Sequence, residues 1–257
     1  MSRGIATYGG RRHDSETARK EFAAVIARTL SRGGTVVVPA FAIDRTEIVL
    51  HELADLRRDG ILPSSVPVYV DSPMALAALD VYRDALRSGS PELRPEILAQ
   101  GEAAISPEPF LAARAVQESI DNNNTAVPPS SSSAGMATGG RVLHHLHRLL
   151  PDPRNAVVIV GFAAAGTRAR DLVDGVPALK MFGEYIPVRA EVAYVPYFSA
   201  HADARQIIDW LRGAPPPHTT YLVHGEESAA ATLRDRIDHE LGWTSVVPKP
   251  GEAVLVR

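Results

Sequence analysis

Short apolar runs alternate with amphipathic stretches along most of the chain. Continuous apolar runs, typical of strands buried on both faces of a sheet, occur at residues 35–38, 68–70 and 155–160. Apolar residues at helical spacing predict helices over 15–30 and 45–59, each followed by glycine. Strands and helices in this order favour a parallel sheet with right-handed crossovers.

The pattern changes character twice. Residues 74–124 are polar and helical, which predicts helices over 74–86 and 110–120. Residues 179–194 contain shorter alternating segments typical of antiparallel strands, so a domain boundary is expected near 174–178.

The carboxyl-terminal part returns to strand and helix signals, whereas no complete element is predicted before Thr7. The predicted elements there are a helix capped by Asp203, a strand at 219–223, a helix at 228–241 and closing strands at 245–247 and 253–256. The expected fold class is therefore α/β.

Composition narrows the class of protein. The 257 residues are 45% hydrophobic with a mean hydropathy of -0.05, which is enough for a large core. No apolar run approaches the ~20 residues that span a bilayer, and no signal-peptide pattern is present, so a soluble cytoplasmic protein without membrane contact is expected. The chain has no cysteine, so any metal ligands must be His, Asp or Glu. With a net charge of -3, a polyanionic substrate would need a local basic site.

Two histidines stand at junctions between predicted elements. His201 lies in the loop before the helix that Asp203 opens, and His224 follows the predicted strand at 219–223. The carboxyl ends of strands are where open α/β sheets place their chemistry. A single histidine there is more often a cap or a turn residue, but two in so short a span favour a functional site.

A second candidate site is a segment of small and hydroxylated residues. Residues 133–140 run directly into a helix that begins near Arg141. Exposed N–H groups at a helix start, with hydroxyls and an arginine nearby, form an anion or phosphate site. The segment matches neither the P-loop nor the dinucleotide fingerprint. The preceding Asn, Pro and Ser tract at 122–131 is typical of a flexible linker.

The predicted helix after Arg141 carries three histidines, His144, His145 and His147. Their spacing of i, i+1 and i+3 does not place them on one helix face. Solvent contact or core packing is therefore favoured over metal binding for these residues.

Eight segments, in this order, resemble the β-CASP branch of the metallo-β-lactamase superfamily, which contains RNA-processing nucleases. They are T-Y-G-G-R-R-H (7–13), V-P-A-F-A-I-D-R-T-E (38–47), V-D-S-P-M-A (70–75), S-A-G-M-A-T-G-G-R-V-L-H-H-L (133–146), G-F-A-A-A-G-T (161–167), F-G-E-Y-I-P-V-R-A (182–190), F-S-A-H-A-D (198–203) and L-V-H-G-E (222–226). Together they span nearly the whole chain and are far more specific than any one of them.

The resemblance implies hydrolysis of RNA phosphodiesters, with two zinc ions that activate water and stabilise the transition state. It places His224 at the position of a zinc ligand. It places His201 at that of a histidine that contacts the scissile phosphate and assists leaving-group departure. Asp203 is expected to give structural support as a helix cap. The residues expected to line the RNA channel are Ser133, Gly135, Met136, Thr138, Gly139 and Arg141.

The sequence also departs from the family pattern. The family's main metal cradle, H-x-H-x-D-H, does not occur, so we expect the chain alone to bind no zinc tightly and to be inactive or nearly so. Ile5 stands where an acidic residue is usual, Gly10 where Asp is common, and Asp44 where Gly is common. Pro128, Pro129 and the serine run replace what is normally an apolar strand.

These observations predict two domains. A parallel-sheet β-CASP domain is expected over 1–175, and the carboxyl-terminal segment of a metallo-β-lactamase-like αββα domain, the RNA-specificity region, over 176–257. The expected function is that of a zinc-dependent ribonuclease with RNA as its partner. The alternative is a noncatalytic RNA-binding or partner-docking module that needs no metal. The final strands would lack a partner sheet, which a homodimer or a separate amino-terminal half would supply.

Overall fold

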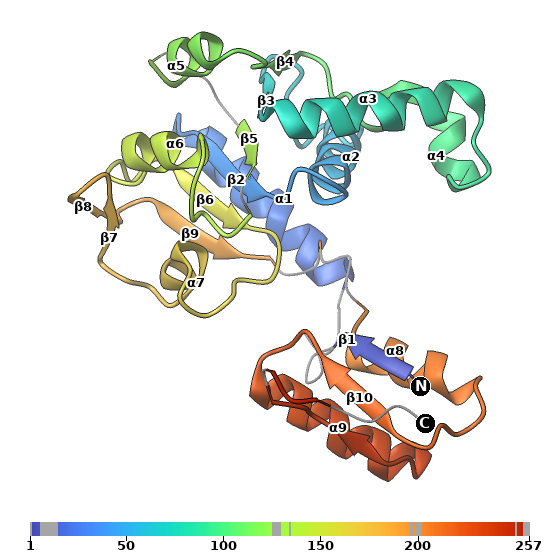
Figure 1. The fold of residues 1–257 in the computed structure, drawn as a ribbon. Coiled ribbons are helices and arrows are strands. Elements are labelled where there is room, and N and C mark those ends of the chain that lie inside the picture. Colours follow the sequence, from blue (N-terminus) through green and yellow to red (C-terminus); the bar gives the residue numbers. More distant parts are fainter. Residues whose placement is uncertain are drawn as a thin grey trace. The chain divides into compact units, whose positions relative to one another are not determined.

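The computed structural model describes residues 2–5, 15–124, 130–133, 135–195, 198, 202–249 and 251–253 (Figure 1). The chain divides into two compact units. The large unit is Ser15–Phe198, and the small unit combines Met1–Asp14 with Ser199–Arg257. Both are mixtures of helices and strands with parallel sheets, which confirms the predicted α/β class. Within the described ranges, no helix has the length and apolarity to cross a membrane.

A six-stranded parallel sheet forms the centre of the large unit. Its strands, in spatial order, are β4 (Phe110–Ala112), β3 (Val68–Asp71), β5 (Ser130–Ser133), β2 (Val36–Ala40), β6 (Ala156–Ile159) and β9 (Glu191–Tyr194). Every residue of β2, β3 and β6 is buried, as the continuous apolar runs predict.

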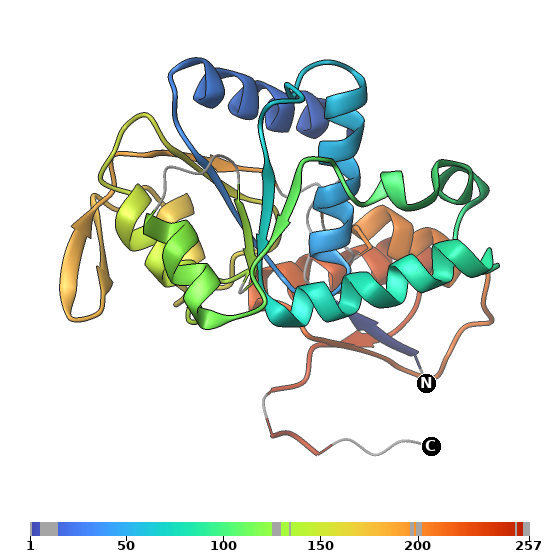
Figure 2. The same cartoon turned by 90° about the horizontal axis from the view of Figure 1, so that it is seen from above.

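Helices cover both faces of this sheet (Figure 2). Successive residues of a strand point to opposite faces, so Val36 and Val38 belong to one core cluster and Val37 to another. The first cluster contains apolar residues of α1 (Ser15–Ser31), α2 (Arg45–Arg58) and α3 (Pro73–Ser88). The second contains those of α6 (Val142–Leu149) and α7 (Arg168–Val173).

The remaining elements of the large unit lie outside this sandwich. The antiparallel hairpin of β7 (Ala178–Met181) and β8 (Glu184–Pro187) forms a separate two-stranded sheet. The segment between β3 and β5 contains α4 (Pro95–Gln100), the 3₁₀ helix η1 (Gly101–Ala104) and α5 (Val116–Asn124).

The small unit has a three-stranded parallel sheet in the order β1 (Ser2–Ile5), β10 (Thr220–Val223), β11 (Ser245–Val246). Its core joins Leu222 of β10 to Ile207 and Ile208 of α8 (Ala204–Arg212) and to Leu233 of α9 (Glu227–Leu241). Val223, the next residue of β10 after Leu222, is exposed.

Several predicted elements are confirmed with shifts of one or two residues at their ends. These are the helices now seen as α1, α2, α3, α6, α8 and α9, and the strands β2, β3, β6 and β10. The hairpin predicted after residue 179 is also present as β7 and β8.

Four predictions need correction. The helix predicted over 110–120 is a strand, β4, followed by α5. The segment predicted as antiparallel up to residue 194 ends in β9, which is parallel to β6. β1 precedes Thr7, where no element was expected, because its partner β10 is far away in the sequence. The serine run is not part of a linker: it forms β5, which pairs with β2 on one side and β3 on the other.

Candidate functional site

The segment predicted to bind phosphate connects β5 to α6 at the carboxyl edge of the large sheet. Ala137 anchors this loop because it is fully buried in the second core cluster, with a φ of 52°. The carbonyl of Met136 accepts a hydrogen bond from the backbone N–H of Ala169 at 3.1 Å. The Arg168 guanidinium donates to the carbonyl of Thr138, also at 3.1 Å. The loop is therefore tied to the start of α7.

The donors of this loop remain available. Thr138 and Gly140 are exposed and Gly139 is half-buried. Among the described residues, none accepts a hydrogen bond from the backbone N–H groups of these three residues. Such a run of amides just before a helix can hold an anion. Ser133 belongs to β5, and its side chain lies outside the described part of the structure.

Gly135 has a packing role that the sequence did not indicate. A β-carbon at this position would lie 2.9 Å from Phe41 Cδ2 and 3.1 Å from the Phe41 backbone nitrogen. The loop after β5 therefore touches the turn after β2, and only glycine allows this approach.

Arg141 points into a buried polar cluster. Its Nη1 donates to Asp71 Oδ1 at 2.8 Å and to the carbonyl of Ala113 at 3.0 Å. Ser119 Oγ and His145 Nε2 each lie 2.6 Å from the other carboxylate oxygen of Asp71. Asp71 itself is completely buried at the end of β3. We call Asp71, Ser119, Arg141 and His145 the Asp71 cluster.

The Asp71 carboxylate is held in its charged form. Burial raises the pKa of Asp71, but the hydrogen bonds from His145, Ser119 and Arg141 outweigh burial and lower this pKa below its usual range. Arg141 and His145 lie four residues apart on one side of α6, so both reach the same carboxylate. The cluster thus fixes the helix that follows the loop, and Arg141 is committed to it.

The other histidines of α6 contact the β7–β8 hairpin. The His144 ring stacks on Phe182 with centroids 4.7 Å apart, and His147 Nε2 lies 3.6 Å from a carboxylate oxygen of Glu184. Core packing for His145 and surface contacts for its neighbours agree with the prediction.

The turn after β2 also contains unusual groups. Asp44, at a position where the resembling family usually has glycine, has a φ of 62° and accepts a 2.6 Å hydrogen bond from the Tyr82 hydroxyl. Glu47, in the first turn of α2, is only 4% exposed. Burial raises the pKa of Glu47 to about 7, although backbone N–H groups partly oppose the rise.

The candidate site of the small unit is His224. It directly follows β10, is exposed, and has a φ of 61°. The predicted cap at Asp203 is present: its carboxylate accepts from the Gln206 backbone N–H at 2.9 Å, and the Gln206 side chain accepts from the Asp203 backbone N–H at 2.9 Å. His201 lies outside the described residues, so its position relative to His224 stays a prediction.

The described residues do not form a metal site by themselves. No group of three or more His, Asp or Glu side chains in the described ranges could hold an ion. A catalytic zinc normally takes about three protein ligands, so His224 alone does not fit a complete site. Any role for zinc therefore needs ligands beyond those that the structure describes.

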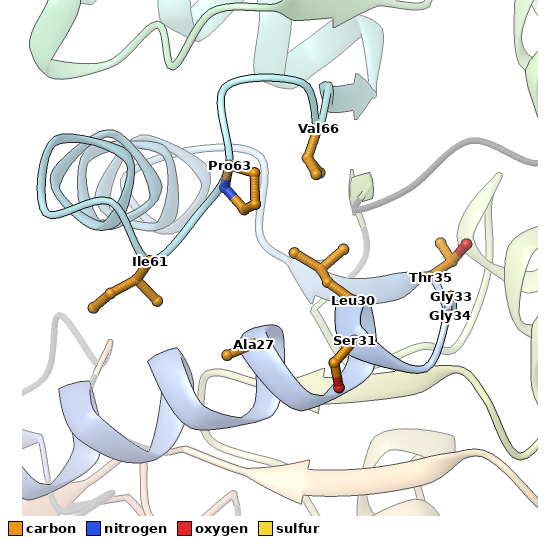
Figure 3. A pocket seen from close by; sticks show the side chains of 9 residues that line it. All are labelled: Ala27, Leu30, Ser31, Gly33, Gly34, Thr35, Ile61, Pro63 and Val66. Atoms are coloured by element: carbon orange, nitrogen blue, oxygen red, sulfur yellow. The ribbon is translucent and has the colours of Figure 1, made fainter.

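A pocket of about 510 Å³ lies elsewhere in the large unit, between the end of α1 and the loop before β3 (Figure 3). Leu30, Ile61 and Val66 line it, together with Thr35 just before β2. It is therefore at the amino edge of the parallel sheet, opposite the loop that follows β5, and contains none of the predicted site residues.

Two family models match different parts of the chain. Residues 46–172 match the Beta-Casp domain, and residues 185–248 match the Zn-dependent metallo-hydrolase RNA specificity domain. The chain belongs to the β-CASP branch of the metallo-β-lactamase superfamily. The boundary predicted between residues 175 and 176 lies between the two matches, and this domain division stays a prediction.

Similar proteins include a ribonuclease and a transcription termination factor. Ribonuclease TTHA0252 of Thermus thermophilus is 37% identical over 88% of this chain and 52% of its own length. Transcription termination factor FttA of Pyrococcus abyssi is 32% identical over 98% of this chain and 40% of its own. An RNase J-like protein of Methanocaldococcus jannaschii is 31% identical over 92% and 53%. The chain thus spans about half the length of these relatives or less.

Proposed function

We propose that this chain provides the RNA-binding part of a zinc-dependent ribonuclease. The observation that carries the proposal is the 37% identity with Ribonuclease TTHA0252 along 88% of the chain. The match of residues 185–248 to an RNA specificity domain of zinc-dependent hydrolases supports the same substrate. The reaction of such an enzyme is hydrolysis of RNA phosphodiesters.

The loop after β5 suits the substrate part of this role. Backbone amides of Thr138, Gly139 and Gly140 offer neutral donors for phosphate oxygens, at a helix start where the dipole favours negative charge. Gly135 and Met136 position the loop through packing and backbone contacts. Arg141 acts through the Asp71 cluster, which fixes α6.

In the small unit we assign two roles that follow from the family. His224 contributes one ligand to a zinc ion, whose bound water would attack the phosphodiester in the complete enzyme. His201 contacts the scissile phosphate and assists departure of the leaving group. Asp203 gives structural support by fixing the start of α8.

A second candidate is a noncatalytic RNA-binding module, in which the amides of the loop after β5 hold RNA without a metal. In both cases we expect the 257-residue chain by itself to bind RNA without cleaving it. Only the ribonuclease role needs further zinc ligands, which a homodimer or a separate polypeptide would supply. Location in the cytoplasm stays a prediction.

The test uses the purified chain and a fluorescently labelled single-stranded oligoribonucleotide. We expect an affinity that falls as salt rises from about 50 to 200 mM and does not change with a chelator. Intact RNA after incubation with zinc is expected for the chain alone. Metal-dependent cleavage that disappears in His224→Ala would instead show a complete enzyme. No binding at low salt would overturn the RNA proposal itself.

The two candidates differ in what happens when ligands are supplied. Light scattering with and without zinc reports the oligomeric state of the chain. If zinc-dependent assembly or a ligand-bearing partner generates cleavage that His224→Ala abolishes, the ribonuclease role is supported. If RNA binding persists but no such addition generates cleavage, the noncatalytic role is the better description.

A further inference from the structure

The helices after three adjacent strands leave the large sheet toward opposite faces. α2 follows β2 and α3 follows β3, and both pack in the first core cluster. α6 follows β5, which lies between β2 and β3, and packs in the second cluster on the other face. The loop after β5 therefore diverges from the loops on both of its sides. Such divergence at the carboxyl ends of parallel strands is where α/β sheets form ligand crevices.

Large apolar side chains flank this divergence and face solvent. Phe41, the first residue after β2, is 40% exposed although one edge of its ring packs against Gly135. Met74, three residues after β3, is 65% exposed. Because β5 separates β2 from β3, the two strand ends are about 9 to 10 Å apart. The donors at residues 138–140 follow the strand between them.

The turn that carries Phe41 is held firmly by hydrogen bonds. The Phe41 carbonyl accepts from the Thr46 hydroxyl at 2.8 Å and from the Thr46 backbone N–H at 3.2 Å. The Arg45 N–H donates to the Ile43 carbonyl at 2.7 Å, and Tyr82 bonds to Asp44. A fixed, partly exposed aromatic ring loses little conformational freedom when a flat ligand stacks on it.

We propose that Phe41 is a stacking platform for one base of single-stranded RNA, with Met74 in apolar contact with a neighbouring nucleotide. The inference rests on the proposed RNA-binding function and adds where a base, and not only a phosphate, is recognised. The amides of residues 138–140 are suited to binding the phosphate backbone of RNA. The Phe41 ring offers an aromatic face on which a base of a single strand can stack. Because every base has such a face, the platform gives little sequence preference.

The experiment compares aromatic substitutions under one binding assay. Phe41→Ala is expected to weaken binding of the oligoribonucleotide by roughly 5- to 100-fold, the usual effect of losing one stacked base. Phe41→Trp is expected to keep or increase affinity, whereas Phe41→Leu, which keeps the apolar volume but has no aromatic face, should resemble alanine. Met74→Ala should have a smaller effect of the same sign.

Phe182→Ala is the matched control, because Phe182 is also exposed, at 56%, but lies in the turn of the β7–β8 hairpin. It is expected to bind RNA like the unchanged chain. Circular dichroism of each variant confirms that the fold is retained, and the Leu and Trp variants keep the test valid if the alanine variant unfolds.

An abasic version of the oligoribonucleotide separates this inference from the function on which it rests. The unchanged chain should bind it more weakly than the base-bearing one, and Phe41→Ala should reduce that difference. Equal affinity for both oligonucleotides, with no effect of Phe41→Ala, overturns the platform while RNA binding stands. Failure of the unchanged chain to bind either one overturns both.

Discussion

The carboxyl edge of the large sheet and the carboxyl end of β10 hold their polar residues in different ways. At the first, Asp71 is completely buried and three side chains of the same unit donate hydrogen bonds to it. At the second, His224 directly follows the strand, is exposed and has a left-handed backbone conformation. One region buries its polar side chains, and the other has an imidazole at the surface.

This difference distinguishes residues that support the fold from residues that are exposed to a ligand. Buried, satisfied polar groups fix the backbone around them, so the Asp71 cluster shapes the loop that is proposed to hold RNA. His224 has a left-handed backbone conformation, which is strained for any residue but glycine, and such strain is common at functional sites. Substitutions should therefore cost stability in the first region, whereas glycine in the second should relieve strain.

The largest effect is expected for Asp71→Ala. It would leave the half-buried Arg141 and the buried His145 without their shared carboxylate, which should lower the free energy of unfolding by about 3–5 kcal/mol. Urea denaturation measures this loss. Asp84→Ala is the control, because Asp84 pairs with Arg87 at the surface, where a change within about 0.5 kcal/mol is expected. Equal effects of the two variants would contradict the structural role of the cluster.

The next largest effect concerns Glu47 and pH. The pKa of Glu47 rises from 4.5 to about 7 on folding, so the folded protein binds the proton more tightly than the unfolded chain does. The contribution of this group to stability is therefore greatest at low pH and falls as pH rises through 7, by about 3 kcal/mol in total.

Glu47→Gln removes this dependence, since the amide does not titrate. Unfolding free energies of both proteins at about pH 5 and about pH 8 give the difference, and the variant should gain relative to the unchanged protein at the higher pH. A constant difference between the two proteins at both pH values would show that Glu47 does not titrate in this range.

At β10 the expected effect is smaller and of opposite sign. His224→Gly should raise the free energy of unfolding by up to about 1 kcal/mol, because glycine adopts a φ of 61° without strain. Thermal unfolding measures the gain, with His224→Ala, which keeps the strain, as the comparison. A glycine variant that is clearly less stable would make His224 a structural residue of the small unit.

The smallest effect is expected for Asp44→Gly, although Asp44 also has a left-handed φ of 62°. Relief of strain, worth about 1 kcal/mol, is offset by loss of the hydrogen bond from Tyr82, which is worth about the same. The net change should lie within about 0.5 kcal/mol. Tyr82→Phe should destabilise the unchanged protein but not the glycine variant, and equal effects in both backgrounds would show that the bond contributes nothing.

Local patterns predicted the elements whose stability depends on their own apolar face. The buried runs of β2 and β6 and the helical spacing of α2 and α9 are examples. The serine strand β5 has no such signal, because its place is determined by pairing with β2 on one side and β3 on the other. β9 was assigned the wrong direction because alternation does not reveal which strand is the partner.

The sequence likewise predicted only part of the candidate site. The small residues after position 133 indicated the loop, and the junction after β10 indicated His224. The Asp71 cluster was missed because its members are 22 to 74 positions apart or separated by a helical turn, and only the folded sheet brings them together. The four-residue spacing of Arg141 and His145 was the one available signal.

The serine strand has a consequence for how the RNA loop is placed. Four identical residues form β5, so a slide of this strand by one position would still leave serine at three of its four places between β2 and β3. Such a slide would carry the loop by about 3 Å along the strand direction. The register of this strand is therefore determined by two small residues that follow it. Gly135 contacts Phe41, and Ala137 is fully buried.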